Sequence, residues 1–173
     1  MRFLTPTQCV EWCAQHSYPA GPQEHYTVPK ADKNPEGFHF AEFTLPGDSG
    51  RKVALARSLY SLIDSNSELL LWLGEWSVWP SSGHMPLFTR FRSAFGEHRN
   101  LIDAPGHLVT PLERDDGIAV VLLSLVFVWD CHVISSSGRD ALFISHDEYG
   151  WFGSRDAADA GSAAQKLRPF IDQ

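Results

Sequence analysis

The chain has 173 residues, of which 43% are hydrophobic and 20% charged, and its formal net charge is -7. This length and composition suffice to bury a hydrophobic core as one domain, residues 1–173, and exclude a largely disordered chain. Residues 101–173 hold eleven acids against five bases, and such a negative field argues against nucleic acids and anionic membranes as partners and suits a basic protein partner.

Cysteine content and hydropathy indicate the compartment. The three cysteines, Cys9, Cys13 and Cys131, contain no CxxC pair, and an odd number is a poor disulfide framework. The N-terminus lacks the long apolar core of a signal peptide. The strongest apolar run, residues 118–129, is shorter than the roughly 18 residues of a membrane span. We therefore expect a cytoplasmic protein with reduced thiols and no membrane association.

The first third of the chain predicts a helix, a loop and a strand. Residues 5–16 fit a short helix that is capped by Thr5 or Thr7. Residues 17–37 carry four prolines and few large aliphatic side chains, which predicts a long irregular surface loop. Residues 38–45 place aromatic side chains on one face and end at a Pro-Gly pair, which predicts a strand.

The central part predicts an amphipathic helix followed by a buried strand. Residues 51–63 repeat apolar side chains at helical spacing. Residues 69–80, LLLWLGEWSVWP, are apolar on both faces in their first half, as in a central strand, with a bulge at Gly74. A helix over the same residues is the alternative, because tryptophans recur at i, i+4 and i+7, at Trp72, Trp76 and Trp79.

The last part predicts three helices and a hairpin. Pro86 begins a helix that ends near Gly96. Residues 115–127, capped by Asp115 or Asp116, are apolar all round and predict a central helix, with a strand as the alternative. CHVIS and ALFIS form two strands around a Ser-Ser-Gly turn, and residues 155–167 form a final helix. This order predicts an α+β fold, with a mostly antiparallel sheet of about four to five strands packed against helices.

Several motifs stand out between residues 68 and 152: EWSVWPSSG (75–83), RFR (90–92), APGH (104–107), WDCH (129–132) and FISHDEYGWF (143–152). Together they resemble an uncharacterised bacterial protein family that has no established activity. The resemblance implies a bacterial origin and carries no mechanism.

A metal or acid-base site is the sharpest chemical hypothesis from the residues themselves. Its candidates are of types that bind divalent metals or transfer protons near neutral pH: His107, Cys131, His132, His146, Asp147 and Glu148. Their spacing matches no metal signature, and we prefer to interpret 146–148 as turn residues before Gly150. No G-x-S-x-G, GxGxxG or GxxxxGK[ST] string occurs. We therefore predict no catalytic residue, no metal and no cofactor.

Arginines and tryptophans offer a second candidate site. Trp76 and Trp79 precede Arg90 and Arg92 in sequence, and such side chains recognise anions or aromatic ligands. Solvated helical arginines are the simpler interpretation. APGH predicts a tight turn, because a Pro-Gly pair suits the centre of a type II turn.

The leading hypothesis is a noncatalytic, acidic protein-interaction module, such as an immunity-type protein that neutralises a basic toxin or enzyme. It rests on size, acidity and the lack of a complete catalytic motif. One alternative is a metal-dependent hydrolase that uses a His/Asp/Glu cluster. The other is a small-ligand binder with a Trp-lined pocket. The candidate binding residues are Trp76, Trp79, Arg90, Arg92, His107, His132, His146, Asp147 and Glu148.

Overall fold

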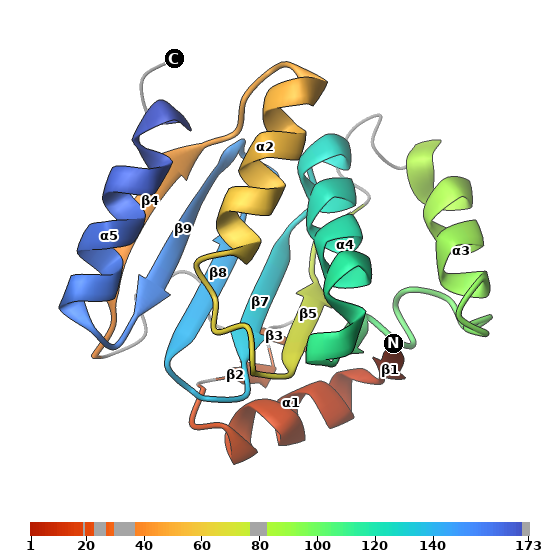
Figure 1. Cartoon of the computed structure of the whole chain (residues 1–173). Helices are drawn as coiled ribbons and strands as arrows, with labels where there is room; N and C mark the ends of the chain where they lie inside the picture. Colours follow the sequence, from red (N-terminus) through yellow and green to blue (C-terminus); the bar gives the residue numbers. More distant parts are fainter. Residues whose placement is uncertain (19, 23–26, 30–36, 77–82, 171–173) are drawn as a thin grey trace.

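A computed structural model describes residues 1–18, 20–22, 27–29, 37–76 and 83–170. Its centre is an antiparallel sheet of seven strands in the order β1-β6-β5-β7-β8-β9-β4 (Figure 1). The strands are β1 (Arg2–Leu4), β4 (His39–Thr44), β5 (Leu69–Leu73), β6 (Gly106–Val109), β7 (Cys131–Ser135), β8 (Asp140–Ile144) and β9 (Tyr149–Ser154). A separate hairpin joins β2 (Ala20–Pro22) to β3 (Thr27–Pro29).

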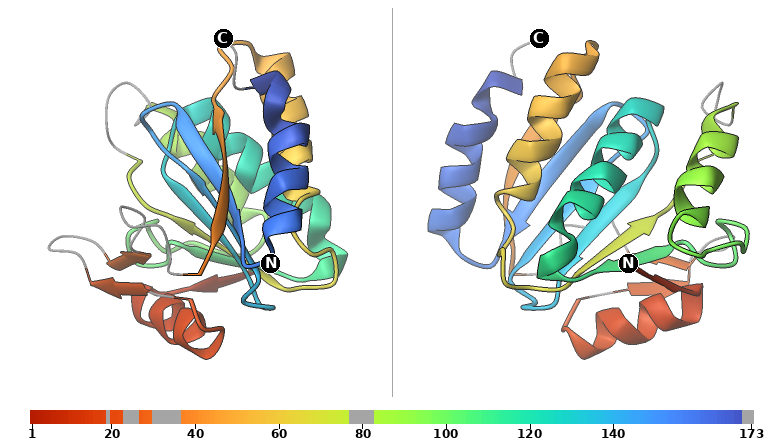
Figure 2. Two further views of the ribbon diagram at one scale, coloured as in Figure 1. Left: turned by 90° about the vertical axis from the view of Figure 1, so that its left-hand side faces the viewer. Right: turned by 45° about the vertical axis from the view of Figure 1, so that its right-hand side comes forward.

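The described helices lie on both sides of this sheet. They are α1 (Pro6–Gln15), α2 (Ser49–Tyr60), α3 (Met85–Ser93), α4 (Arg114–Phe127) and α5 (Ala157–Leu167), with short 3-10 turns η2 (Pro111–Glu113) and η3 (Arg168–Phe170). Helices α2, α4 and α5 cover one face, and α1 and the β2-β3 hairpin lie at one end of the other side (Figures 1 and 2). Helix α3 stands beside α4 (Figure 1).

The strand register divides the core into two clusters. Residues directly opposite each other on antiparallel strands share a face. Leu71 of β5 pairs with Val133 of β7 in the cluster under α2, α4 and α5. Trp72 pairs with His132 and belongs to the face that α1 covers. The central strands are buried on both faces, as the apolar run at Leu69–Leu73 predicts.

The prediction of an α+β fold with a mostly antiparallel sheet is confirmed, but the number of four to five strands is wrong. The strands that were not predicted are short or rich in glycine. β1 has three residues and β6 has four, and β9 contains Gly150 and Gly153. At Gly150 a Cβ would lie 2.3 Å from Phe43 Cζ, so this glycine permits close packing of β4 against β9.

Two further predictions are corrected at β6 and β5. The APGH segment is not a type II turn, since Gly106 begins strand β6 and is not among the residues with positive φ. Leu69–Leu73 form a strand, so the alternative helix is wrong there. Trp79 lies outside the described residues. Within the Pro-rich segment 17–37, β2 and β3 replace part of the expected irregular loop.

Helix α4 differs in its position from the expected central helix. It begins earlier than predicted, after a reciprocal capping box between Thr110 and Glu113, so Asp115 and Asp116 lie in its first turn. There their carboxylates lie near the positive end of the helix dipole, and neither residue is the N-cap of the helix. One side packs on the sheet, whereas Leu122 is only partly buried at the edge of the core cluster. None of the helices in the described ranges is long and apolar enough to cross a bilayer.

Candidate functional site

A β-bulge shapes the sheet where β5 ends and β7 begins. The Gly74 amide donates to the carbonyl of Asp130 over 2.9 Å, and the Asp130 amide donates to the carbonyl of Glu75 over 3.0 Å. Two residues of one strand therefore oppose one residue of the other, the pattern of a β-bulge. The expected irregularity at Gly74 is thus present, and it brings Glu75 next to Asp130.

Four polar side chains meet at this end of the sheet, and we call Glu75, Asp130, His146 and Asp147 the acidic cluster. Asp130 Oδ1 lies 2.8 Å from His146 Nδ1 and accepts the His146 backbone amide over 2.6 Å. Glu75 Oε2 lies 3.8 Å from His146 Nδ1, and Asp147 Oδ1 lies 3.6 Å from His146 Nε2. The side chain of Asp130 is only 17% exposed, against 70% for Asp147.

The turn between β8 and β9 presents His146 and Asp147. The Ser145 amide donates to the carbonyl of Tyr149, and the Glu148 amide donates back to the carbonyl of Ser145. Glu148 has a φ of 62°, so the chain reverses tightly through a left-handed residue. The preferred interpretation of 146–148 as turn residues is confirmed, and the turn aims His146 at Asp130.

Burial and charge act in opposite directions within the cluster. Burial raises the pKa of Asp130 and outweighs the hydrogen bonds from His146, which lower it. Burial alone would lower the pKa of His146, but its hydrogen bond to Asp130 and the charges of Asp130, Asp147 and Glu75 outweigh burial and raise this pKa. Within the described ranges, the cluster's ion pairs involve only His146, and no lysine or arginine pairs with its carboxylates.

His107 and His132 do not join His146. His107 pairs with Leu71 and His132 with Trp72, so their side chains lie on opposite faces of the sheet. Both are fully buried, and burial is the main cause that lowers the pKa of each to about 3. These two imidazoles are neutral core groups, and His107 packs against the rings of Phe3 and Phe88.

The remaining sulfur candidate, Cys131, is also a core residue. Its side chain is inaccessible to solvent, and burial raises the pKa of the thiol to about 12. A protonated, enclosed thiol is a poor nucleophile. The proposed group of histidines, cysteine and acids is therefore not brought together. His107, His132 and Cys131 lie in the core, only His146 and Asp147 belong to the acidic cluster, and Glu148 is exposed in the turn beside it.

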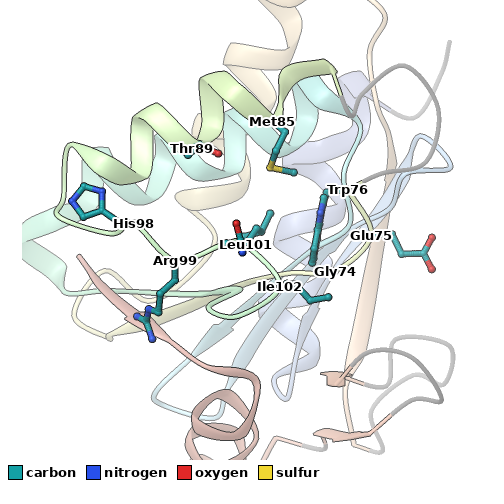
Figure 3. A pocket seen from close by; sticks show the side chains of 10 residues that line it. Gly74, Glu75, Trp76, Met85, Thr89, His98, Arg99, Leu101 and Ile102 are labelled. Atoms are coloured by element: carbon teal, nitrogen blue, oxygen red, sulfur yellow. The ribbon is translucent and has the colours of Figure 1, made fainter.

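A pocket of about 470 Å³ opens on the other side of the 74–76 segment. It is lined by Gly74, Glu75, Trp76, Met85, Thr89, His98, Arg99, Asn100, Leu101 and Ile102. Figure 3 shows the indole of Trp76 beside Met85 and Leu101, while the carboxylate of Glu75 points away from them. The pocket and the acidic cluster thus use opposite sides of one short segment.

The predicted arginines take different roles. Arg90 is exposed on α3. Arg92 is 2% exposed and donates to the carbonyl of Ala104 over 2.7 Å, with its guanidinium above the ring of Phe3. It therefore holds the loop before β6 in place. Neither residue lines the pocket, whereas Arg99 does, with its guanidinium bound to the buried Glu97.

The acidic residues Glu75 and Asp130 were missed from sequence. Each flanks a buried apolar strand, Glu75 after β5 and Asp130 before β7. An acid at such a strand end is a weak signal that gains meaning only when the strands are known to be neighbours. Compared with protein-family models, with curated proteins and with solved structures, the chain matches none.

Proposed function

We propose that the protein is a noncatalytic interaction module that binds a basic protein partner through the acidic end of its sheet. The observation that supports the proposal is the convergence of Glu75, Asp130 and Asp147 around one histidine, beside the exposed Glu148. A surface with several carboxylates and no paired lysine or arginine among the described residues attracts a partner of opposite charge.

The surroundings of the cluster suit a protein contact. Tyr149 follows the turn and is 48% exposed, and exposed tyrosines are enriched where proteins bind one another. Candidate catalytic groups are poorly placed by comparison, because Cys131, His107 and His132 are all enclosed in the core. An immunity-type role, in which the module neutralises a basic toxin or enzyme, fits this acidic surface.

The proposal is tested by measuring association rates. The immobilised protein first captures basic proteins from a lysate of its source cells, and the captured protein is then purified. Asp147→Lys and Glu148→Lys should each slow its association several-fold at low salt, because exposed charges act mainly through steering. The effect should shrink at physiological salt, where the Debye length is about 8 Å rather than the roughly 30 Å at 0.01 M.

A matched control comes from the other end of the molecule. Asp115 is an exposed acid in the first turn of α4, whereas Asp130 follows the opposite end of this helix, so Asp115→Lys makes the same charge change a full helix length from the cluster. This variant should associate at close to the parent rate. Equal on-rates for Asp147→Lys, Glu148→Lys and the parent at low salt would rule out the acidic end as the binding surface.

A small-ligand binder is the second candidate, and the pocket beside Trp76 favours it. Pockets of about 300–1,000 Å³ with apolar walls and a few polar groups are typical ligand sites, and this pocket has a volume of about 470 Å³. Ile102 is 54% exposed at its wall. Screening by ligand-observed NMR should give hits that are lost in Ile102→Arg, and hits unchanged in that variant would exclude the pocket.

A further inference from the structure

We propose that Glu75, Asp130 and His146 form a binding site for one divalent transition-metal ion. Each offers one ligand atom, and the three atoms all lie within 4.8 Å of one another. They come from three separate segments: the bulge after β5, the residue before β7 and the β8-β9 turn. This inference does not depend on a protein partner.

The spacing of the ligand atoms suits a first-row metal. Nitrogen and carboxylate ligands bind zinc at about 2.0–2.2 Å, which places two ligand atoms of one ion roughly 3 to 3.5 Å apart. In the structure, His146 Nδ1 lies 2.8 Å from Asp130 Oδ1 and 3.8 Å from Glu75 Oε2. These distances bracket the required range, so small side-chain rotations open the site for an ion.

The surroundings hold the ligands in position. The bulge fixes the backbone of Glu75 against Asp130, and the His146 amide anchors the Asp130 carboxylate. Asp147 Oδ1 lies 3.6 Å from His146 Nε2, the ring nitrogen that would remain free when Nδ1 binds a metal. A carboxylate beside the second nitrogen of a ligand histidine is a common orienting contact.

The charge balance of the three ligands favours a cation at this place. Asp130 is largely buried beside a second carboxylate, and its described ion-pair partner is a histidine rather than a permanent cation. A bound divalent ion would balance the charge of these carboxylates.

The donor set selects the class of metal. One imidazole nitrogen with two carboxylate oxygens suits Zn²⁺, Co²⁺ or Mn²⁺, whereas Mg²⁺ and Ca²⁺ prefer oxygen ligands alone. Glu75 is 47% exposed, so the site opens to solvent. Three protein ligands leave coordination positions for water or for a donor group from a bound molecule.

The test is metal titration of the chelator-treated protein without any partner. Zn²⁺ titrated in a calorimeter, and Co²⁺ followed by its visible absorption, should each saturate at one ion per chain. His146→Ala and Asp130→Asn should lower the affinity at least about tenfold, a loss that even outer contacts of a metal site commonly cause. Zn²⁺ should raise the melting temperature of the parent but not of these variants.

Matched controls separate the site from general surface binding. Glu148→Gln removes an exposed acid of the same turn that is outside the three ligands, and His98→Gln removes an exposed histidine elsewhere; both should bind as the parent does. Glu75→Gln changes a half-exposed side chain, so it replaces Asp130→Asn as the ligand variant if Asp130→Asn fails to fold. Absence of saturable binding by the parent, or equal affinity in all variants, overturns the site. Association with a basic partner, measured in chelator, is unaffected by that result.

Discussion

Acid should destabilise the protein through His107, the imidazole buried at the centre of β6. Burial, followed by the nearby charge of Arg92, lowers the pKa of His107 to about 3, whereas the unfolded value is about 6.5. A histidine whose folded pKa is depressed contributes stability above its unfolded pKa, and this is lost as pH falls. Between pH 6.5 and 4, protonation of this histidine in the unfolded chain should lower the free energy of unfolding by about 3 kcal/mol, with a limiting slope of about 1.4 kcal/mol per pH unit.

The assay is urea unfolding at several pH values between 7 and 4. His107→Phe keeps a planar ring between Phe3 and Phe88 but cannot titrate, and it loses the contact from Nδ1 to the carbonyl of Pro105, 3.0 Å away. The free energy of unfolding of this variant should be about 1 kcal/mol lower than that of the parent at pH 7. Its dependence on pH should be shallower, by up to about 1.4 kcal/mol per pH unit. His98→Gln, at an exposed histidine, should keep the parent slope. Identical slopes for His107→Phe and the parent would refute the assignment of a neutral, buried imidazole.

Two stability predictions follow from the packing of α4. Leu125 is fully buried and Leu122 is half-buried on the same helix. Leu125→Asp should therefore unfold the protein at a cost of several kcal/mol, while Leu122→Asp should leave a folded protein with a lower melting temperature. Similar melting temperatures for the two variants would contradict this orientation of α4. Gly117→Ala should destabilise by about 1–3 kcal/mol instead of gaining helix propensity, because its Cβ would lie 2.2 Å from Tyr60 Oη. Adding Tyr60→Phe should recover part of that loss in a double-mutant cycle, and additive losses would exclude the clash.

Helices were predictable from the sequence because their signals are local. Thr5 and Gln8 form the capping box of α1, and the apolar spacing of α2 repeats over three turns. Three strands of the sheet, β1, β6 and the glycine-containing β9, lack such signals. β1 and β6 are too short for a period of two to be recognised, and they are strands because Phe3, His107 and Leu71 pair in one row across the sheet. Strand structure there is a product of tertiary pairing rather than of local preference.

The candidate site was predictable only in part for the same reason. His146 and Asp147 attracted notice because they are consecutive in the chain. Glu75 and Asp130 are 55 residues apart and become neighbours because β5 and β7 pair antiparallel, so that the end of one meets the start of the other. No spacing rule contains this information, which depends on the order of the strands and on the bulge at Gly74.

Burial explains why the charged chemistry lies at the end of the sheet. The sequence offers His107, His132 and His146 as equal candidates. The first two lie within paired strands of the sheet, where burial keeps them neutral. His146 lies in a turn beyond the last paired row, with its side chain 25% exposed, and the carboxylates around it raise its pKa. A carboxylate in the central rows would face the same desolvation without a partner. At the rim, Glu75 is half-exposed to solvent and Asp130 has His146 as its partner, and this is the place where we propose that a basic partner or a metal ion binds.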